Sequence, residues 1–346
     1  MWHRCPWTAA RSAESIFAMQ TRRLGDQDIP PLGIGTWAIG GPIERFGKRI
    51  GWGEVDDAVS LCALRTALDA GIRLIDSSDA YGAGRSERLI GEAIAGRRDE
   101  VILATKFGHS FDEASGSLGE DRWEPDFIRA ACEGSLRRLG VECIDLYQFH
   151  ISAAVEAGGE VRQVLEELVA AGKIRWFGWS TDRVASFEQF ADSPHCVAVQ
   201  QHLNVAWDEW SNRDLLHLAE RAGCASLVRG PLGHGLLTGK YHAEARPPAD
   251  DFRHDWNLVD GEQAETLARL EAVRDILQSD GRSLVQGALA WVWGLSPVTI
   301  PIPGFKNQDQ ISGLVGALEH GPLPVEQMRT IDRILGRQLV GGGPGA

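Results

Sequence analysis

Short apolar segments alternate with longer amphipathic segments along most of this 346-residue chain. Eight of the apolar segments are typical of β-strands, and each ends where polar residues begin. They are residues 32–36, 73–76, 101–106, 144–150, 174–180, 196–202, 224–230 and 298–304. A repeated strand-helix order favours a parallel sheet with helices packed against it. Eight such repeats predict an α/β fold, a single (β/α)8 TIM barrel.

Glycines mark the expected ends of several helices. Amphipathic segments are followed directly by Gly71, Gly140 and Gly172. A glycine just past the last turn readily takes the left-handed conformation that closes a helix. Residues 22–31 are expected to form a short hairpin below the barrel, and residues 323–335 a C-terminal helix. The longest loop is expected over residues 241–261, after the seventh strand and therefore on the catalytic face.

The expected domain organisation is one barrel between two short ends. Residues 1–20 are predicted to be an N-terminal extension, either disordered or an artefact of an upstream start, because Met19 directly precedes the apparent start of folded sequence. They lack the contiguous apolar core of a secretion signal. Residues 21–336 form the predicted barrel, and residues 337–346 are expected to be a flexible tail.

Composition limits the partners that this chain can have. Its net charge is −13 and its pI is about 5.3, so its overall field repels the phosphates of nucleic acids and anionic membranes. No apolar run approaches the roughly twenty residues that a membrane helix needs. The six cysteines show no CxxC or Cys/His metal spacing, which predicts reduced thiols, a cytoplasmic location and no metal site. A small-molecule substrate and a monomer or small homo-oligomer are expected.

Four polar residues fall where predicted strands end or have just ended: Asp76, Tyr81, Lys106 and His150. In (β/α)8 barrels, chemistry takes place at the carboxyl ends of the strands. A tyrosine phenol has a pKa near 10, so it donates a proton well only if a nearby cation stabilises the phenolate. Lys106 is suited to supply that cation. Asp76 is suited to hold it charged, and His150 to orient a substrate oxygen.

Each of these residues also has a purely structural interpretation. Asp76 and Lys106 can form an ion pair between strands, Tyr81 can anchor a loop, and a lone histidine is more often a core residue than a catalyst. Four compatible groups at one end of three consecutive strands are unlikely packing accidents, so the set favours an active site. The chemistry indicated is proton donation to a carbonyl oxygen.

Several segments give the chain a resemblance to the aldo-keto reductases from about Thr21 to about Gly336. These segments are residues 32–37, 75–82, 84–91, 105–108, 144–150, 233–240 and 302–304. The resemblance implies a TIM barrel that binds NADPH across the strand ends without a Rossmann domain. It also implies that Asp76, Tyr81, Lys106 and His150 form the family's catalytic tetrad.

The resemblance further implies a set of cofactor-binding residues. They are Gly35, Thr36, Trp37, Asp76, Ser180, Thr181, Gln200, Arg229, Gly230, Pro231, Leu232, Gly235, Leu236, Lys240, Gly304, Lys306 and Gln310. Two positions depart from the family's pattern. Thr181 stands where an asparagine is usual, and Arg229 where a tyrosine usually stacks on the nicotinamide. A planar guanidinium can also stack, or it can instead pair with a carboxylate at the barrel rim.

The segment after the eighth predicted strand resembles the family's cradle for the adenosine phosphate. Gly304 opens the turn, and Lys306 supplies a point charge for a 2′-phosphate. NADPH is therefore expected over NADH, with use of both cofactors left open. The substrate pocket is expected to be lined by Trp37, Trp52, Tyr81, Trp123 and His150. Flat aromatic walls suit a sugar, an aromatic aldehyde or a polyketide alike.

The sequence therefore predicts an NADPH-dependent oxidoreductase. It is expected to reduce an aldehyde or ketone to an alcohol with Tyr81 as general acid, and the reverse oxidation is equally permitted. The principal alternative is a redox-sensing regulatory subunit of the potassium-channel β type, with slow turnover. A third possibility uses the tetrad for proton abstraction without net reduction.

Overall fold

The computed structural model describes residues 21–207 and 210–337, and within this part of the chain eight parallel strands form the central sheet. Their order is β3 (Gly33–Gly35), β6 (Leu74–Asp76), β7 (Ile102–Phe107), β10 (Ile144–Phe149), β11 (Ile174–Ser180), β12 (Cys196–His202), β13 (Ala225–Arg229) and β14 (Thr299–Pro301). A parallel bridge between Gly35 and Gly304 joins the first strand to the segment after the last. The predicted (β/α)8 barrel is confirmed, and each predicted strand segment overlaps one of these strands.

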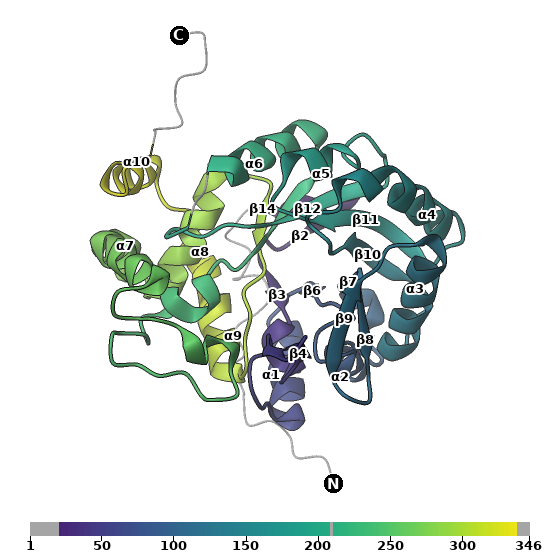
Figure 1. Cartoon of the computed structure of the whole chain (residues 1–346). Helices are drawn as coiled ribbons and strands as arrows, with labels where there is room; N and C mark the ends of the chain where they lie inside the picture. The colour runs from purple at the N-terminus through teal and green to yellow at the C-terminus, as the bar shows by residue number, and fades with distance from the viewer. Residues whose placement is uncertain (1–20, 208–209, 338–346) are drawn as a thin grey trace.

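Helices surround the strands, as Figure 1 shows. They are α1 (Asp57–Asp69), α2 (Arg85–Ala93), α3 (Pro125–Leu139), α4 (Gly158–Ala170), α5 (Val184–Glu188), α6 (Trp210–Ala222), α7 (Glu262–Leu277), α8 (Leu284–Leu295), α9 (Gln308–Val315) and α10 (Val325–Ile334). Gly71, Gly140 and Gly172 have positive φ angles of 85°, 66° and 70°, as their predicted role at helix ends requires. Among the described residues, no helix is long and apolar enough to cross a membrane.

Two apolar clusters hold the barrel together. The larger lies between the strands and the helices, and it includes Phe177 and Trp291. The smaller lies inside the barrel and contains Leu74, Leu146 and Trp176 together with Leu24 and Ile29. Since β1 (Arg22–Leu24) and β2 (Gln27–Ile29) supply those last two side chains, the predicted N-terminal hairpin covers one end of the barrel interior.

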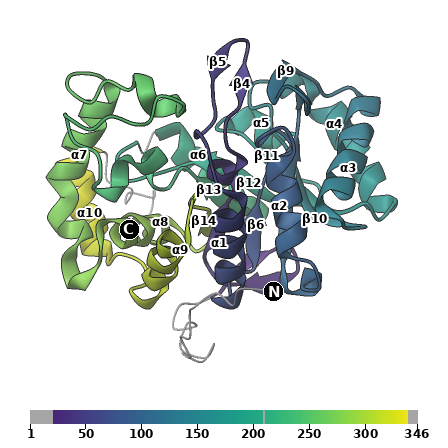
Figure 2. The same ribbon diagram turned by 90° about the horizontal axis from the view of Figure 1, so that it is seen from below.

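A second, smaller sheet was not predicted from the sequence. Its strands are β5 (Lys48–Arg49), β4 (Glu44–Arg45), β9 (Ser117–Asp121) and β8 (His109–Asp112), in that order. Figure 2 shows β4 and β5 projecting from one end of the barrel. These strands are short and mostly polar, so they lack the apolar alternation that identifies a strand in sequence. They form because two loops of the barrel pair with each other.

The prediction of reduced cysteines holds for the thiols of Cys132, Cys143, Cys196 and Cys224, which are free. It is wrong for Cys62, which is disulfide-bonded. A disulfide requires only that two Cβ atoms come within about 4 Å in the folded chain. The spacing of cysteines along the sequence does not reveal such proximity. The predicted extension at residues 1–20 and nearly all of the predicted tail at residues 337–346 lie outside the described residues.

Candidate active site

The strand register brings three of the four tetrad residues to one edge of the barrel. β7 pairs with β6 so that Ala104 lies opposite Asp76, and with β10 so that Lys106 lies opposite Gln148. His150 follows β10 directly, with its amide donating to the Phe107 carbonyl at 2.9 Å. Tyr81 lies in the turn between β6 and α2, where its amide donates to the Ser78 carbonyl at 3.1 Å.

The Lys106 ammonium is the centre of the predicted tetrad. Its Nζ atom donates to Asp76 Oδ2 at 2.6 Å, to the Ser77 carbonyl at 2.6 Å and to the Tyr81 hydroxyl at 3.3 Å. The side chain is fully buried, and that of Asp76 is 3% exposed. The structure therefore brings together the phenol, the ammonium and the carboxylate of the predicted tetrad.

Two glutamines complete the surroundings of Asp76. Gln148 and Gln200 donate to its Oδ1 atom from Nε2 at 3.0 and 2.8 Å. Gln200 was predicted as a cofactor residue, but the role of Gln148 was missed. Its signal in the sequence is an uncharged polar residue between Tyr147 and Phe149, near the carboxyl end of the strand Ile144–Phe149. Both amides orient the carboxylate so that its other oxygen faces Lys106.

The environment sets the charge state of each group. Burial raises the pKa of the Tyr81 phenol, and the charge of Lys106 opposes that rise, so the phenol keeps its proton. Burial tends to lower the pKa of Lys106, but the charges of Asp76 and Tyr81 outweigh it and the pKa lies above its usual value. Burial, His109, Lys106 and Arg229 lower the pKa of His150 well below its usual range, which leaves a neutral imidazole.

A cavity of about 670 Å³ extends from Asp76 and Tyr81 to α9. Fourteen of the predicted cofactor residues line it: Gly35, Thr36, Trp37, Asp76, Gln200, Arg229, Gly230, Pro231, Leu232, Gly235, Lys240, Gly304, Lys306 and Gln310. Ser180, Thr181 and Leu236 were also predicted but are not among its lining residues. The Thr181 hydroxyl instead lies 2.9 Å from that of Ser152, in the loop after β10.

Arg229 lines the cavity and also forms an ion pair with Asp182. The second oxygen of Asp182 accepts the backbone N–H of His202 at 2.7 Å, which fixes the carboxylate between two strand ends. The ion pair at the barrel rim is therefore present, and the guanidinium also borders the space that the nicotinamide was expected to occupy. The Arg229 side chain is 34% exposed.

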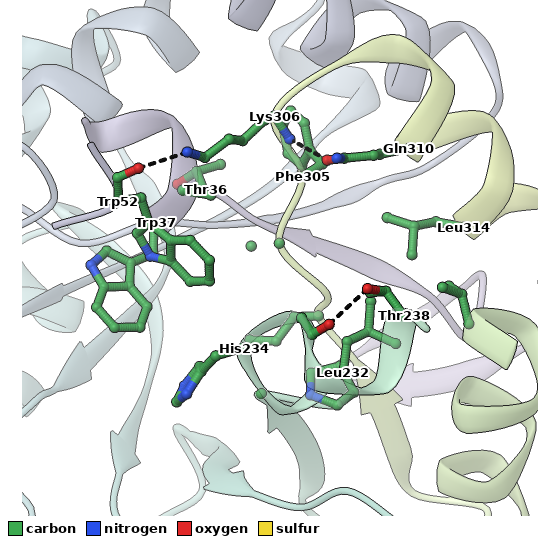
Figure 3. Close-up of a pocket in the computed structure, with 18 of the residues that line it drawn as sticks. Thr36, Trp37, Trp52, Leu232, His234, Thr238, Phe305, Lys306, Gln310 and Leu314 are labelled. Carbon is green, nitrogen blue, oxygen red and sulfur yellow. Dashed lines mark hydrogen bonds between the residues drawn. The ribbon is translucent and has the colours of Figure 1, made fainter. Parts of the chain in front are cut away.

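Lys306 is held by two hydrogen bonds in the wall of the cavity, as Figure 3 shows. Its ammonium donates to the Trp52 carbonyl at 2.6 Å, and its backbone N–H donates to Gln310 Oε1 at 2.7 Å. Lys240 and Arg253 line the same cavity. Burial, with the charges of Arg253 and Lys306, lowers the pKa of Lys240. Together with Arg229, four basic side chains therefore border one cavity, an arrangement that suits a bound anion.

Aromatic rings form the wall beside Tyr81. The Trp37 ring lies 6.2 Å from that of Tyr81 at an interplanar angle of 26°, and Trp52 meets Trp37 edge-on at 5.2 Å. The loop histidine His234, which the sequence did not single out, also lines the cavity. Trp123, in contrast, packs against Phe149 and is not among the lining residues.

His150 is not a lining residue either, but its ring lies 6.2 Å from that of Tyr81. Within the part of the chain that the structure describes, no three His, Cys, Asp or Glu side chains are placed to hold a metal ion.

Comparisons with known proteins agree with this geometry. The model of the aldo/keto reductase family matches residues 31–335. The aldo-keto reductase YhdN of Bacillus subtilis is 32% identical over 308 residues, which cover 88% of this chain and 89% of YhdN. The aldo-keto reductase yakc [NADP(+)] of Schizosaccharomyces pombe is 30% identical over 307 residues, covering 87% of each protein.

A solved structure has the same fold. The glycerol dehydrogenase AKR11B4 from Gluconobacter oxydans superposes with a TM-score of 0.79 at 31% identity, covering 95% of this chain and 99% of that one. The family match spans most of the chain and includes all four tetrad positions. The chain therefore belongs to the aldo/keto reductase family, and it is an oxidoreductase that acts on carbonyl and alcohol groups.

Proposed function

We propose that this protein transfers a hydride between NADPH and an aldehyde or ketone, with Tyr81 as the general acid. The observation that carries the proposal is the contact of Lys106 with both Asp76 and the Tyr81 hydroxyl at one end of the cavity. A phenol held against a buried ammonium is suited to release its proton to an oxygen that gains negative charge.

The tetrad keeps its charges fixed while the proton moves. Asp76 neutralises Lys106, and its own oxygens are held by the two glutamine amides. Because the ammonium remains charged, it stabilises the phenolate that forms when Tyr81 donates. The neutral imidazole of His150 is available to hold the carbonyl oxygen near Tyr81. In the oxidative direction, the same phenolate accepts the proton of the alcohol.

The cavity's donor set fits NADPH. Lys240, Arg253 and Lys306 provide the positive charge that phosphates require, and the cavity connects them with Asp76 and Tyr81. When bound, the cofactor supplies the hydride. Lys306 supports the 2′-phosphate and therefore NADPH over NADH, and the S. pombe relative carries NADP(+) in its name. Asp76, Gln200 and Arg229 line the opposite end, where we place the nicotinamide.

The proposed substrate site is the aromatic end of the cavity. Trp37, Trp52 and Tyr81 line it, and His150 lies beside Tyr81. Trp123 contributes indirectly, through its packing against Phe149. The flat indole faces suit sugars and aromatic carbonyls, so both classes belong in a test panel, together with glycerol-derived carbonyls suggested by the Gluconobacter enzyme.

The decisive experiment measures NADPH consumption with sugar-derived, aromatic and short-chain carbonyls, and NADP+ reduction with the corresponding alcohols. Tyr81→Phe is expected to lower kcat by about 10²–10⁴-fold, the usual contribution of a general acid. Tyr147→Phe is the matched control, because Tyr147 is fully buried and its hydroxyl has no hydrogen-bond partner among the residues that the structure describes. Full activity of Tyr81→Phe would refute its role as the acid.

A further inference from the structure

The imidazole of His150 has a polar neighbour in the turn after β6. Its Nδ1 atom lies 3.3 Å from the Ser78 hydroxyl. Ser78 is fully buried and lies two residues after β6, in the turn that leads to Tyr81. Two titratable groups have rings close to that of His150: His109, at 5.0 Å between ring centroids, and Tyr81, at 6.2 Å. Ser78 is thus placed to influence which nitrogen of His150 carries the hydrogen.

The position of that hydrogen matters because the ring is neutral. A neutral imidazole has one N–H, so one nitrogen donates and the other accepts. The low pKa of His150, caused by burial and by the nearby charges of Lys106 and Arg229, supports this state. To hold a carbonyl oxygen, the nitrogen that faces it must carry the hydrogen. If Nδ1 accepts from Ser78, then Nε2 carries it.

The contacts of Ser78 limit what its single hydroxyl hydrogen can do. The backbone N–H of Ala80 donates to Ser78 Oγ at 3.2 Å, so one lone pair of the oxygen is occupied. The hydroxyl hydrogen then has two possible acceptors: His150 Nδ1, and Asp79 Oδ1 at 3.3 Å. An ionised Asp79 would accept this hydrogen in competition with His150. A neutral Asp79 is a weaker acceptor, and it has a carboxyl hydrogen of its own to donate.

The surroundings of Asp79 disfavour its ionised form. The residue is 1% exposed, and a second buried carboxylate, Glu87, lies close enough to interact with it. Arg138 and Thr105 already donate to Glu87, at 2.7 and 2.6 Å, so Glu87 is the acid stabilised as a carboxylate. Burial and the charge of Glu87 raise the pKa of Asp79 well above its usual value.

We propose that Ser78 is a positioning residue for the reaction: it donates its hydrogen to Nδ1 of His150 and so holds the imidazole with its hydrogen on Nε2, facing the substrate oxygen. Asp79 assists as a neutral acid that leaves the Ser78 hydrogen for the histidine. The expected effect of Ser78 on kcat rests on the proposed carbonyl chemistry. The tautomer of His150 itself does not depend on that chemistry.

The first test is ¹⁵N NMR of the full chain labelled in histidine, with the His150 signals assigned by their loss in His150→Asn. In the wild type, we expect Nε2 to carry the hydrogen and Nδ1 to have the shift of a bare nitrogen. In Ser78→Ala, we expect the Nδ1–H tautomer to become populated. A wild-type ring with its hydrogen on Nδ1 overturns the proposal, even if the variant does not fold.

Kinetics supply the second test. Ser78→Ala is expected to lower kcat about tenfold, the loss of roughly one neutral hydrogen bond, with the Kd for NADPH unchanged. Ser135→Ala is the matched control, since Ser135 is also fully buried but lies in α3. Asp79→Asn, which keeps a neutral donor, should retain the wild-type tautomer of His150. A shifted tautomer in Asp79→Asn would refute the role of Asp79.

The two proposals fail in different ways. If Tyr81→Phe keeps full activity while His150 still carries its hydrogen on Nε2, the proposed carbonyl chemistry is wrong. The proposed role of Ser78 in fixing the His150 tautomer is then still supported. If Tyr81→Phe is inactive but the His150 tautomer is unaffected by Ser78→Ala, the carbonyl chemistry stands and the role of Ser78 is refuted.

Discussion

Asp76 holds several side chains in place in the candidate active site. Its carboxylate accepts hydrogen bonds from the side chains of Lys106, Gln148 and Gln200, which come from three different strands. Taking a carboxylate and an ammonium out of water is costly, and the cost is offset only while both partners and their hydrogen bonds are present. The site therefore depends on the complete set of contacts.

Removing one charge of the Asp76–Lys106 ion pair should destabilise the protein strongly. We expect Asp76→Asn to lower the free energy of unfolding by about 3–5 kcal/mol, because it leaves the Lys106 ammonium buried without its counter-charge. Urea unfolding followed by circular dichroism measures the change. The double variant Asp76→Asn/Lys106→Met should recover part of the loss. Equal costs for the single and double variants would contradict this explanation.

Two other histidines near the cavity make stability depend on pH. Burial, with the nearby charge of Arg229, lowers the pKa of His202 to about 4. Burial, His202, Arg229 and Arg253 lower that of His234 to about 3. Their usual value is 6.5. Between these values the unfolded chain binds more protons than the folded one, so stability is full above pH 6.5 and falls on acidification toward pH 4.

Unfolding in urea at pH 7.5 and at pH 4.5 tests whether protonation of these histidines lowers the free energy of unfolding. We expect each of these histidines to contribute a loss on the order of 2–3 kcal/mol over that interval. His234→Gln should reduce the loss, and His217→Gln, on an exposed position of α6, is the matched control. An unchanged pH dependence in His234→Gln would show that other groups cause the acid sensitivity.

At the scale of elements, close contacts between strands determine where side chains are allowed. Gly178 lies in β11, where the register against β12 shifts between Phe177 and Gly178. A Cβ atom at Gly178 would lie 2.4 Å from the backbone oxygen of Ala198. Neither backbone can move far, since both strands are hydrogen-bonded on two sides within the barrel. A glycine is therefore required at this position.

Gly178→Ala is expected to lower the free energy of unfolding by about 1–3 kcal/mol through this overpacking. Gly159→Ala in α4 is the matched control, because a Cβ there meets no atom within 4 Å and the position is exposed. That substitution should stabilise by about 0.4–1 kcal/mol, since alanine loses less conformational freedom on folding. Thermal and urea unfolding measure the stability of both variants. Similar effects of both substitutions would rule out the steric explanation.

At the scale of the whole molecule, loops that are distant in sequence meet over the cavity. The loop after β13 contacts the loop after β3 through a bridge between Trp52 and Asp251. Arg253 pairs with Asp251, donates to the His234 carbonyl at 3.0 Å and lies over the Trp52 ring at 4.3 Å. Lys306, from a third segment, donates to the Trp52 carbonyl. The cofactor end of the cavity is thus assembled from three separate segments.

Arg253→Met should weaken NADPH binding more than it slows the chemical step. We expect the Kd for NADPH to rise at least about tenfold, the effect of losing one charge-assisted contact, with a smaller change in kcat. Arg246→Ala is the matched control: this arginine lies in the same loop, is exposed, and within the described part of the chain donates to the Ala243 and Ala245 carbonyls. Fluorescence titration measures Kd, and an unchanged value in Arg253→Met would exclude a role for this contact in cofactor binding.

The sequence by itself determined the barrel and indicated which end of it carries the proposed catalytic residues. The strand segments, the helix-ending glycines and the four tetrad positions were all visible because they depend on local periodicity and on where each apolar run ends. The tertiary structure alone decided the contacts that join distant segments. Gln148 and Gln200 converge on Asp76 from separate strands, Arg229 pairs with Asp182, and the polar strands β4, β5, β8 and β9 pair with one another. Such contacts depend on which loops meet above the barrel, and the chain carries no local pattern for that proximity.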